Sequence, residues 1–437
     1  MSEQELELPK GWAKTTIDNM ILQDGLFKDG DWVETKDQDP NGKVRLTQLA
    51  DIKKFEFRIK SNRFMNKTTA EKLDCTFLKK NDILVARMPD PLGRACIFPG
   101  SEVSCVTVVD VAIIRTGDNG IFPNWLMWII NSPQIHSIIE QNQTGTTRKR
   151  ISRKNLSKIN FLLPPLNEQK RIVSKIEELF SKIDSTKQSL EHVKLQLEQY
   201  RFSLLKSVFE GKKLVKTGEV CEGVVPGRYK PQIFDGNIPW ITTPDLDGLY
   251  ISNSKKNLCV SREEVKKVRM KIMPKQTVLL TCVGDLGRIC ITKNEVVPNQ
   301  QFHGFICTEK ILPKYLAYAL TIQIRQMFSA STSTTISYMN KTTCNNLKIP
   351  LASSIEEQEQ IVSKIEQGFS LIENTQNIVN STLQTLQTMK MSMLKQAFEG
   401  KLVPQDPNDE PAHILLEKIK NTKEAKPTKK RRAKNVK

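Results

Sequence analysis

The 437-residue sequence lacks the signatures that many enzymes, metalloproteins and membrane proteins carry. It has no GxxxxGK[ST] phosphate loop and no Pro-Pro methyltransferase motif, since its only Pro-Pro pair is Pro164-Pro165. Its four histidines lie far apart and its nine cysteines form no CxxC pair, so we expect neither a metal site nor a disulfide framework. No apolar run could span a bilayer and no signal-peptide pattern opens the chain, which favours a cytoplasmic protein with reduced thiols.

One pattern imitates a catalytic site. Asp245 follows Pro244, and Glu264 and Lys266 lie further along, as in the carboxylate–carboxylate–lysine arrangement of nucleases. Because 26% of the residues are charged, such a pattern arises readily by chance. A nuclease that uses these three residues is therefore an alternative to the expectation that the chain carries no catalytic residues.

Acidic residues are fewer than basic ones. Against 48 Asp and Glu stand 66 Lys and Arg, which gives a net charge of +18 and a pI near 9.4 and indicates a polyanionic partner. Residues 420–437 hold nine Lys or Arg and one Glu, a composition typical of a disordered tail. A second basic cluster, at residues 148–158, follows a small polar loop at residues 144–147 that lets the backbone approach phosphates. A solvated loop without a ligand is the alternative.

The sequence contains a long internal repeat. Residues 168–212 and 357–401 align without a gap, and 20 of the 45 aligned positions are identical. Fainter matches extend upstream, where Leu92-Gly-Arg94 corresponds to Leu286-Gly-Arg288 and residues 144–147 correspond to residues 331–335. This period is too long for a solenoid repeat. We therefore expect two copies of one unit, each a mixed α/β domain followed by a long helix.

The repeated segments have the periodicity of helices that pack along a coiled-coil seam, with apolar residues at alternating steps of three and four. Ser354 and Glu357 form a capping-box pattern, and Gly211 and Gly400 suit helix ends. Small polar d positions suit close antiparallel contact, or a contact with another element, better than a long free-standing dimer. The residues expected to pack between the helices are Ile172, Ile176, Leu179, Ile183, Leu190, Val193 and Leu197 in the first and Ile361, Ile365, Ile372, Val379 and Leu386 in the second.

These observations predict an α+β chain with pseudo-twofold symmetry. It would consist of two mixed α/β domains in tandem, at residues 1–163 and 213–352, separated by antiparallel coiled-coil helices at residues 164–212 and 353–403. Residues 404–437 would form a basic, disordered tail.

Several segments resemble one family. Residues 162–184 and 348–366 are similar to the two long helices of the specificity subunit of type I restriction-modification systems. Residues 8–12, 236–246, 279–291 and 299–301 resemble the starts and interiors of that family's domains. One departure is that residues 350–355 replace the Pro-Pro-Leu that precedes the first helix, so the start of the second helix is less well defined.

The resemblance implies a division of labour. Each domain would be a target recognition domain that reads one half of a split sequence in double-stranded DNA, and the helices would fix the gap. Two methyltransferase subunits and translocating restriction subunits would be the partners, with adenine methylation and cleavage done by them. Those partners would use S-adenosylmethionine, ATP and Mg, whereas this chain would hold no cofactor and perform no bond chemistry.

The Thr-rich loops and their basic neighbours are the candidate DNA contacts. The predicted residues are Thr146, Thr147, Arg148, Lys149 and Arg150 in the first domain and Thr334, Thr335, Tyr338 and Lys341 in the second. Arg94 and Arg288 are further candidates, with a structural role in a turn as the alternative. Two other functions stay open: a specificity subunit of a related system with fused methylase and nuclease, and a coiled-coil scaffold without sequence preference.

Overall fold

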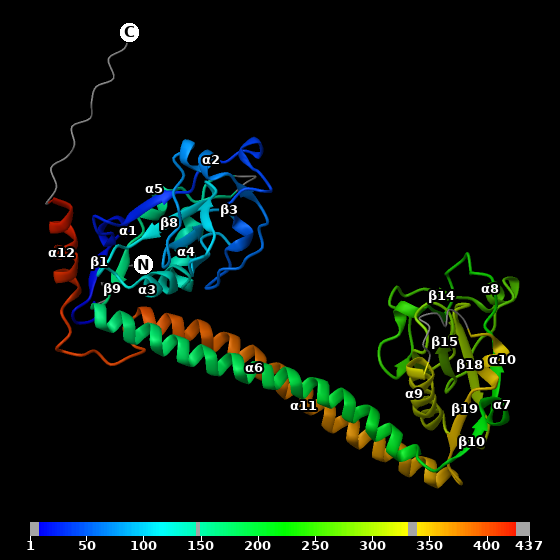
Figure 1. The fold of residues 1–437 in the computed structure, drawn as a ribbon. Coiled ribbons are helices and arrows are strands. Elements are labelled where there is room, and N and C mark those ends of the chain that lie inside the picture. The colour runs from blue at the N-terminus through cyan, green and yellow to red at the C-terminus, as the bar shows by residue number, and fades with distance from the viewer. Residues whose placement is uncertain (1–7, 146–148, 331–338, 425–437) are drawn as a thin grey trace. The chain divides into compact units, whose positions relative to one another are not determined.

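The computed structural model describes residues 8–145, 149–330 and 339–424. The chain divides into two compact units, residues 1–188 with 383–437 and residues 189–382 (Figure 1). Each unit holds one globular domain and a segment of both long helices, so the unit boundaries fall within the helices instead of at their ends. The mixed α/β fold with tandem domains and long helices, predicted from the sequence, is confirmed.

Three small sheets build the first domain. Their strand orders are β2–β8–β5–β6, β4–β3–β7 and β1–β9. The strands are β1 (Ala13–Thr15), β2 (Leu26–Asp29), β3 (Val44–Thr47), β4 (Phe64–Met65), β5 (Ile83–Ala86), β6 (Ala95–Ile97), β7 (Ser104–Thr107), β8 (Val111–Arg115) and β9 (Phe161–Leu163). The central strands β5 and β8 are buried along their length, apart from the last residue of β8, and read as continuous apolar runs.

Short helices cover the sheets of the first domain. They are α1 (Ile17–Met20), α2 (Lys67–Lys72), α3 (Pro123–Ile130), α4 (Pro133–Gln141) and α5 (Arg153–Ser157), with 3-10 turns η1 (Thr35–Asp37) and η2 (Leu49–Asp51). The hydroxyls of Ser132 and Ser152 cap α4 and α5 by accepting free backbone N–H groups. The main core gathers α3, the sheet and the start of the first long helix around the fully buried Trp125.

The second domain repeats this architecture. Its sheets have the orders β11–β18–β15–β16–β13, β14–β12–β17 and β10–β19. The strands are β10 (Lys213–Lys216), β11 (Cys221–Val224), β12 (Ile238–Ile241), β13 (Tyr250–Ile251), β14 (Cys259–Val260), β15 (Val278–Thr281), β16 (Ile289–Thr292), β17 (Val297–Pro298), β18 (Phe302–Cys307) and β19 (Lys348–Leu351). The helices are α7 (Thr217–Val220), α8 (Arg262–Lys267), α9 (Pro313–Ala330) and α10 (Lys341–Asn345), with the 3-10 turn η3 (Thr243–Asp245).

The two long helices are α6 (Leu166–Phe209) and α11 (Ile355–Phe398), each of 44 residues. In the second unit they run antiparallel: Glu198 accepts a hydrogen bond from Gln376, and Leu204, further along α6, lies against Gly368, earlier on α11. A Cβ at Gly368 would lie 2.3 Å from Leu204 Cδ2, so the glycine permits the close approach. In the first unit Asp184 pairs with Lys390 at 2.5 Å.

The residues predicted to pack between the long helices are all at least partly buried. Among the predicted packing residues, the buried ones are Ile172, Ile176, Ile183, Ile361, Ile365, Ile372 and Val379, and the half-buried ones are Leu179, Leu190, Val193, Leu197 and Leu386. At the start of α11 the Ser354 hydroxyl accepts from the backbone N–H of Glu357, as the capping pattern predicts. The Glu357 carboxylate, however, accepts from the backbone N–H of Ser353, one residue earlier than expected.

A glutamine secures the first turn of each long helix to its domain. Gln169 Oε1 accepts from the backbone N–H of Phe122 at 2.9 Å, while its amide nitrogen donates to Pro164 O. In the second unit, Gln358 in the same way accepts from Leu312 N at 2.8 Å and donates to Lys310 O. Both glutamines are buried, so these bonds fix each helix at its start.

The prediction of a disordered tail from residue 404 was wrong for the part up to residue 424. Residues 412–424 form α12 (Ala412–Glu424), which lies beside α1 and β1 (Figure 1). Leu415 and Ile419 join the main core, and Arg171 pairs with Asp409 at 2.6 Å. Charge counting missed this helix because its apolar residues recur every three to four positions between lysines. Residues 425–437 lie outside the described residues.

Within the described ranges, none of the helices combines the length and the apolar character that crossing a membrane requires.

Candidate DNA interface

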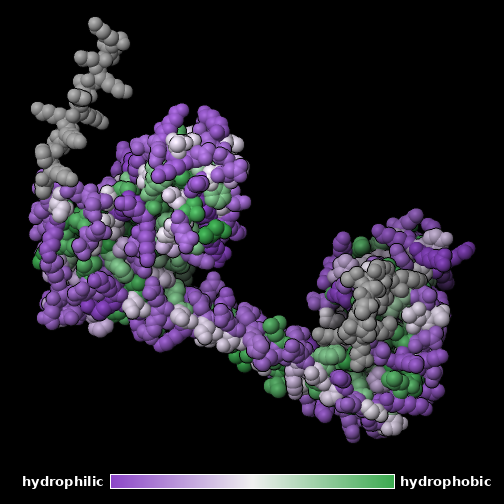
Figure 2. Space-filling view, in the orientation of Figure 1, coloured by the Kyte–Doolittle hydropathy of each residue, from purple (hydrophilic) through white to green (hydrophobic). Residues whose placement is uncertain are grey.

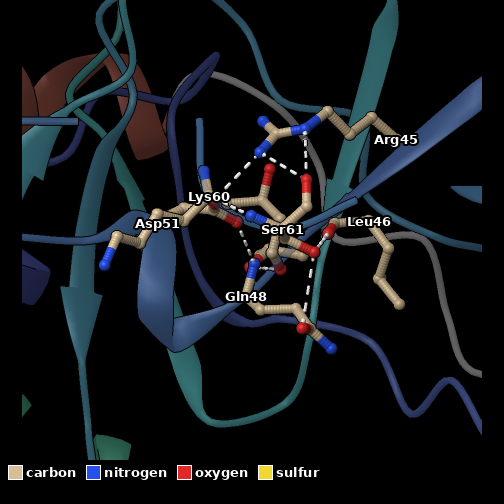
Figure 3. A network of polar contacts seen from close by, with 8 residues as sticks. Arg45, Leu46, Gln48, Asp51, Lys60 and Ser61 are labelled. Carbon is tan, nitrogen blue, oxygen red and sulfur yellow. Dashed lines mark hydrogen bonds and ion pairs between the residues drawn. The ribbon is translucent and has the colours of Figure 1, made fainter. Parts of the chain in front are cut away.

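The 3-10 turn η2 is held by one buried carboxylate. Asp51 accepts hydrogen bonds from the Arg45 guanidinium at 2.8 Å and from the backbone N–H groups of Gln48, Lys60 and Ser61 at 2.7 Å each (Figure 3). Its side chain has no exposure to solvent. Four donors satisfy the carboxylate fully, so the loop that carries Gln48 is rigid.

Asp245 does the same for η3 in the second domain. It accepts from the backbone N–H groups of Thr242 and Lys255, both at 2.7 Å. Hydrogen bonds from Thr242, Lys255 and Ser254 lower the pKa of Asp245, although burial opposes that shift. The sequence 47–52 thus corresponds to the sequence 241–246, and the two aspartates are equivalent caps.

This arrangement accounts for the carboxylates of the alternative nuclease site. Asp245 is engaged as a cap, and the buried Glu264 accepts from the backbone N–H of Gln232 at 2.8 Å. Lys266 is exposed on α8. Over the described ranges, no three His, Cys, Asp or Glu side chains are grouped so that they could hold a metal ion. Structural hydrogen bonds therefore explain both acidic residues.

Arg94 and Arg288 secure these turns to their domains. The Arg94 guanidinium donates to the carbonyls of Ile52 at 2.7 Å, Leu49 at 2.9 Å, Pro91 at 2.9 Å and Met88 at 3.0 Å. Arg288 donates to Leu246 O at 2.6 Å and Thr243 O at 3.3 Å, the equivalent carbonyls. Arg94 is only 5% exposed, and burial lowers its pKa. The structure thus favours the structural alternative for Arg94, whereas 39% of the Arg288 side chain is exposed and its guanidinium also pairs with Asp285 at 3.4 Å.

The Thr-rich loop of the first domain is closed at its base. Thr144 and Arg150 exchange two backbone hydrogen bonds, of 2.8 and 2.9 Å. The next residue, Ile151, donates its N–H to Arg87 O, just beyond β5. In the second domain Met339 donates in the same way to Cys282 O, just beyond β15. Both Thr-rich segments therefore end at the same place on the frame.

A groove of about 630 Å³ opens beside this loop in the first domain. Gln48, Met88, Asp110 and Arg150 line it, together with Trp32, a residue that is 70% exposed. The buried Arg87, next to the groove residue Met88 in the chain, donates to Val109 O and pairs with Asp29 at 3.3 Å. Burial lowers the pKa of Arg87, and Asp29 counteracts that shift. An exposed indole and a guanidinium beside polar side chains suit stacking on, or edge contacts with, nucleic-acid bases.

The predicted contact residues are only partly within the described chain. Thr146, Thr147, Arg148, Thr334, Thr335 and Tyr338 lie outside the described residues. Lys149 and Arg150 are exposed after the Thr-rich segment of the first domain, and Lys341 is exposed as the first residue of α10. The structure brings Arg150 together with groove residues that sequence reasoning did not select, namely Trp32, Gln48 and Asp110. In the second domain, Gln301 was likewise not selected as a contact residue. Only residues 299–301 carried a signal, as part of the family resemblance.

Comparison with known proteins agrees with this architecture. Residues 9–195 and residues 210–382 each match the type I restriction modification DNA specificity domain, so the chain carries that domain twice. The chain therefore belongs to the family of type I restriction-modification specificity proteins, and the resemblance seen in the sequence is confirmed.

Two relatives illustrate the range of similarity. The type I restriction enzyme EcoBI specificity subunit of Escherichia coli is 29% identical over 336 residues, which cover 66% of this chain and 69% of the relative. The MjaIX specificity subunit of Methanocaldococcus jannaschii is 32% identical over 168 residues, which cover 37% of this chain and 38% of the relative's length.

Solved structures share the fold. The HsdS subunit of Thermoanaerobacter tengcongensis aligns over 92% of this chain and 100% of its own, with a TM-score of 0.65 and 19% identity. A chain from a study of complex assembly and conformational transition in the type I R-M system aligns over 91% of this chain and 100% of its own, with a TM-score of 0.71 and 19% identity.

Proposed function

We propose that this chain is the DNA-reading specificity subunit of a type I restriction-modification complex and that it recognises a bipartite target. The observation that carries this proposal is the duplication: one backbone frame occurs twice, with equivalent caps at Asp51 and Asp245, but the groove residues differ. Two such frames suit two short, unlike half-sites. The net charge of +18 supports DNA as the ligand.

Partner subunits supply the chemistry in this proposal. Leu195, Tyr200, Leu371 and Ile378 are exposed on the long helices. Figure 2 shows hydrophobic surface along the middle of these helices. Exposed apolar residues on paired helices suit docking of further helices. We assign this surface to two methyltransferase subunits that use S-adenosylmethionine, with ATP- and Mg-dependent restriction subunits joining them in the cytoplasm. This chain itself would be non-catalytic.

The bipartite proposal is tested by methylome sequencing of cells that carry the full system. The expected motif has two short, unlike parts with a fixed, unread gap, and replacing residues 1–160 with those of a relative changes one part only. A single continuous motif would refute the two-domain reading. A scaffold without sequence preference would enrich no motif from a random DNA pool, and magnesium-dependent cleavage by the isolated chain would favour the nuclease instead.

The gap is proposed to depend on the long helices. Four residues lengthen a helix by about 6 Å, which corresponds to about two base-pair steps. Matched four-residue insertions, one within residues 185–199 of α6 and one within the facing residues 376–390 of α11, should change the gap or abolish activity. The half-sites should stay the same. A changed half-site after such insertions would indicate that a helix itself reads bases.

The basic loop is tested by Arg148→Ala and Arg150→Ala, with affinity measured on cognate and one-base-altered DNA at two salt concentrations. If the arginine binds a guanine edge, its replacement should reduce the binding free energy by about 1–3 kcal/mol and relax specificity at one position. If it contacts only phosphate, its replacement should weaken binding to all sequences alike and reduce the salt slope by about 1. Arg63→Ala removes an exposed charge elsewhere on the domain and serves as the control. Unchanged affinity at low salt would exclude the loop.

A further inference from the structure

Asp110 and Gln301 occupy the same position in the two domains. In β5–β8 Ala86 pairs with Val111, and in β15–β18 Thr281 pairs with Phe302, so the residue before each second strand is equivalent. The next hydrogen bond confirms the match, because Arg87 donates its N–H to Asp110 O at 2.9 Å and Cys282 donates to Gln301 O at 2.7 Å. The carbonyls of Arg87 and Cys282 in turn accept from the N–H groups of Ile151 and Met339, which follow the Thr-rich segments in the chain.

The Gln301 amide has a fixed orientation. The backbone N–H of Gln301 donates to Asn299 Oδ1 at 3.0 Å, so the Asn299 Nδ2 group is the one that faces the Gln301 side chain. Since Nδ2 only donates, the atom that it meets at 2.9 Å is Gln301 Oε1. The Thr243 hydroxyl donates to the same oxygen at 2.9 Å. Gln301 therefore presents its Nε2 group, a pure donor, which has no partner among the described residues.

Asp110 presents the opposite chemistry. The positions equivalent to Thr243 and Asn299 are Leu49 and Val108, which are apolar and line the groove with Asp110. They offer its carboxylate no hydrogen bond, and the described residues supply no other side-chain partner. Asp110 is half-buried, and Arg87 and Arg150 nearby offset its charge. The first domain thus presents a pure acceptor where the second presents a pure donor.

We propose that Asp110 and Gln301 are specificity-determining residues that read one base each, in the first and second half-sites respectively. This inference rests on the proposed DNA-reading function. In the major groove, a carboxylate accepts from an exocyclic amino group, the N4 of cytosine or the N6 of adenine. The fixed amide nitrogen of Gln301 instead donates to an acceptor, the N7 of a purine, the O6 of guanine or the O4 of thymine.

The test compares isosteric variants of the full chain assembled with its methyltransferase, with the motif read from a selection on random double-stranded DNA. Asp110→Asn adds a donor at an unchanged shape, and Gln301→Glu replaces the presented donor with an acceptor while it can still accept from Thr243 and Asn299. Each variant should change the base preference at one position by about 5- to 150-fold. The two positions should lie in different halves of the motif.

Controls separate base reading from charge and folding. Gln360→Glu makes the same chemical change on the exposed face of α11, and Asp110→Glu retains an acceptor; both should keep the wild-type base preference. Melting curves and circular dichroism establish that each variant is folded. An unchanged motif in folded Asp110→Asn and Gln301→Glu, whether or not overall affinity falls, would overturn this inference. A wild-type motif that is not bipartite would instead refute the proposed function.

Discussion

The two domains share their buried polar frame and differ at the surface that the frame supports. Asp51 and Asp245 cap equivalent turns, and Arg94 and Arg288 bind equivalent carbonyls. The groove residues do not correspond in type, since Leu49, Val108 and Asp110 stand where the second domain has Thr243, Asn299 and Gln301. A satisfied buried network tolerates few changes because each lost partner leaves an unpaired group, whereas a groove wall in solvent can vary freely. The comparison therefore separates scaffold from specificity.

The long helices extend the same comparison. Phe180 on α6 contacts Trp128 at 5.1 Å and lies under Lys390 at 4.7 Å. Phe369 on α11 contacts Tyr318 at 5.7 Å and lies under Arg201 at 4.2 Å. Each helix thus contacts its own domain through an aromatic pair, and the same ring on each helix lies under a cationic side chain of the other helix. The first unit also contains α12, for which the described residues of the second unit show no counterpart.

The caps should give the largest difference between the units. Asp51→Ala leaves the buried Arg45 without its counter-charge and three backbone N–H groups without an acceptor, which should cost about 3–5 kcal/mol. Asp245→Ala frees no arginine and should cost about 1–3 kcal/mol. Urea unfolding followed by hydrogen exchange of peptides from each unit measures both effects. Equal losses would show that the Arg45 ion pair adds nothing to the first cap.

The second prediction concerns α12, which has no counterpart among the described residues of the second unit. Ile419 is fully buried in the main core, so Ile419→Ala should destabilise the first unit by about 2–4 kcal/mol. Ile378→Ala, at a residue that is 65% exposed on α11, is the control and should change stability by no more than about 0.5 kcal/mol. Thermal unfolding of both variants decides the matter. A negligible effect of Ile419→Ala would mean that α12 does not contribute to the fold.

The third prediction is a pH dependence in the second unit. Burial lowers the pKa of His303 to about 4, while the unfolded chain retains a value of about 6.5. The unfolded state therefore binds a proton that the folded state rejects, and stability falls as the pH decreases from about 6.5 to about 4. The slope should not exceed about 1.4 kcal/mol per pH unit. Melting of the wild type and His303→Gln across this range isolates the contribution, and an NMR titration with a pKa near 6.5 would contradict it.

The smallest expected effects are at the matched cation sites. Arg201→Met and Lys390→Met should each cost about 0.5–1 kcal/mol from the lost contact with a ring. Lys390→Met should cost slightly more, because Lys390 also pairs with the exposed Asp184 and such pairs contribute up to about 1 kcal/mol. Asp184→Asn measures that second contribution separately. A larger loss in Arg201→Met would reverse the expected order.

Sequence reasoning located the elements whose signal is local and periodic. The predicted helix at residues 164–212 is observed at 166–209, and the helix at 353–403 is observed at 355–398. The tail was wrongly predicted to be disordered, because the prediction relied on its basic composition and did not consider the apolar periodicity of α12. The candidate site was located only in part: Arg150 borders the groove, but Arg94 proved to be buried. Two arginines in similar Gly-Arg turns cannot be ranked by sequence, because their exposure depends on distant carbonyls.

The sequence by itself determined the duplication, the two long helices and the family, because repeats and apolar periodicity are properties of neighbouring residues. Only the tertiary structure decided which residues share a surface. Asp110 and Gln301 lie in strand turns that do not align visibly in sequence, and their equivalence follows from strand register and from matched hydrogen bonds. The fixed donor of Gln301 likewise depends on Thr243, which is distant along the chain. Hydrogen-bond direction is a property of three-dimensional neighbours, which composition and spacing do not specify.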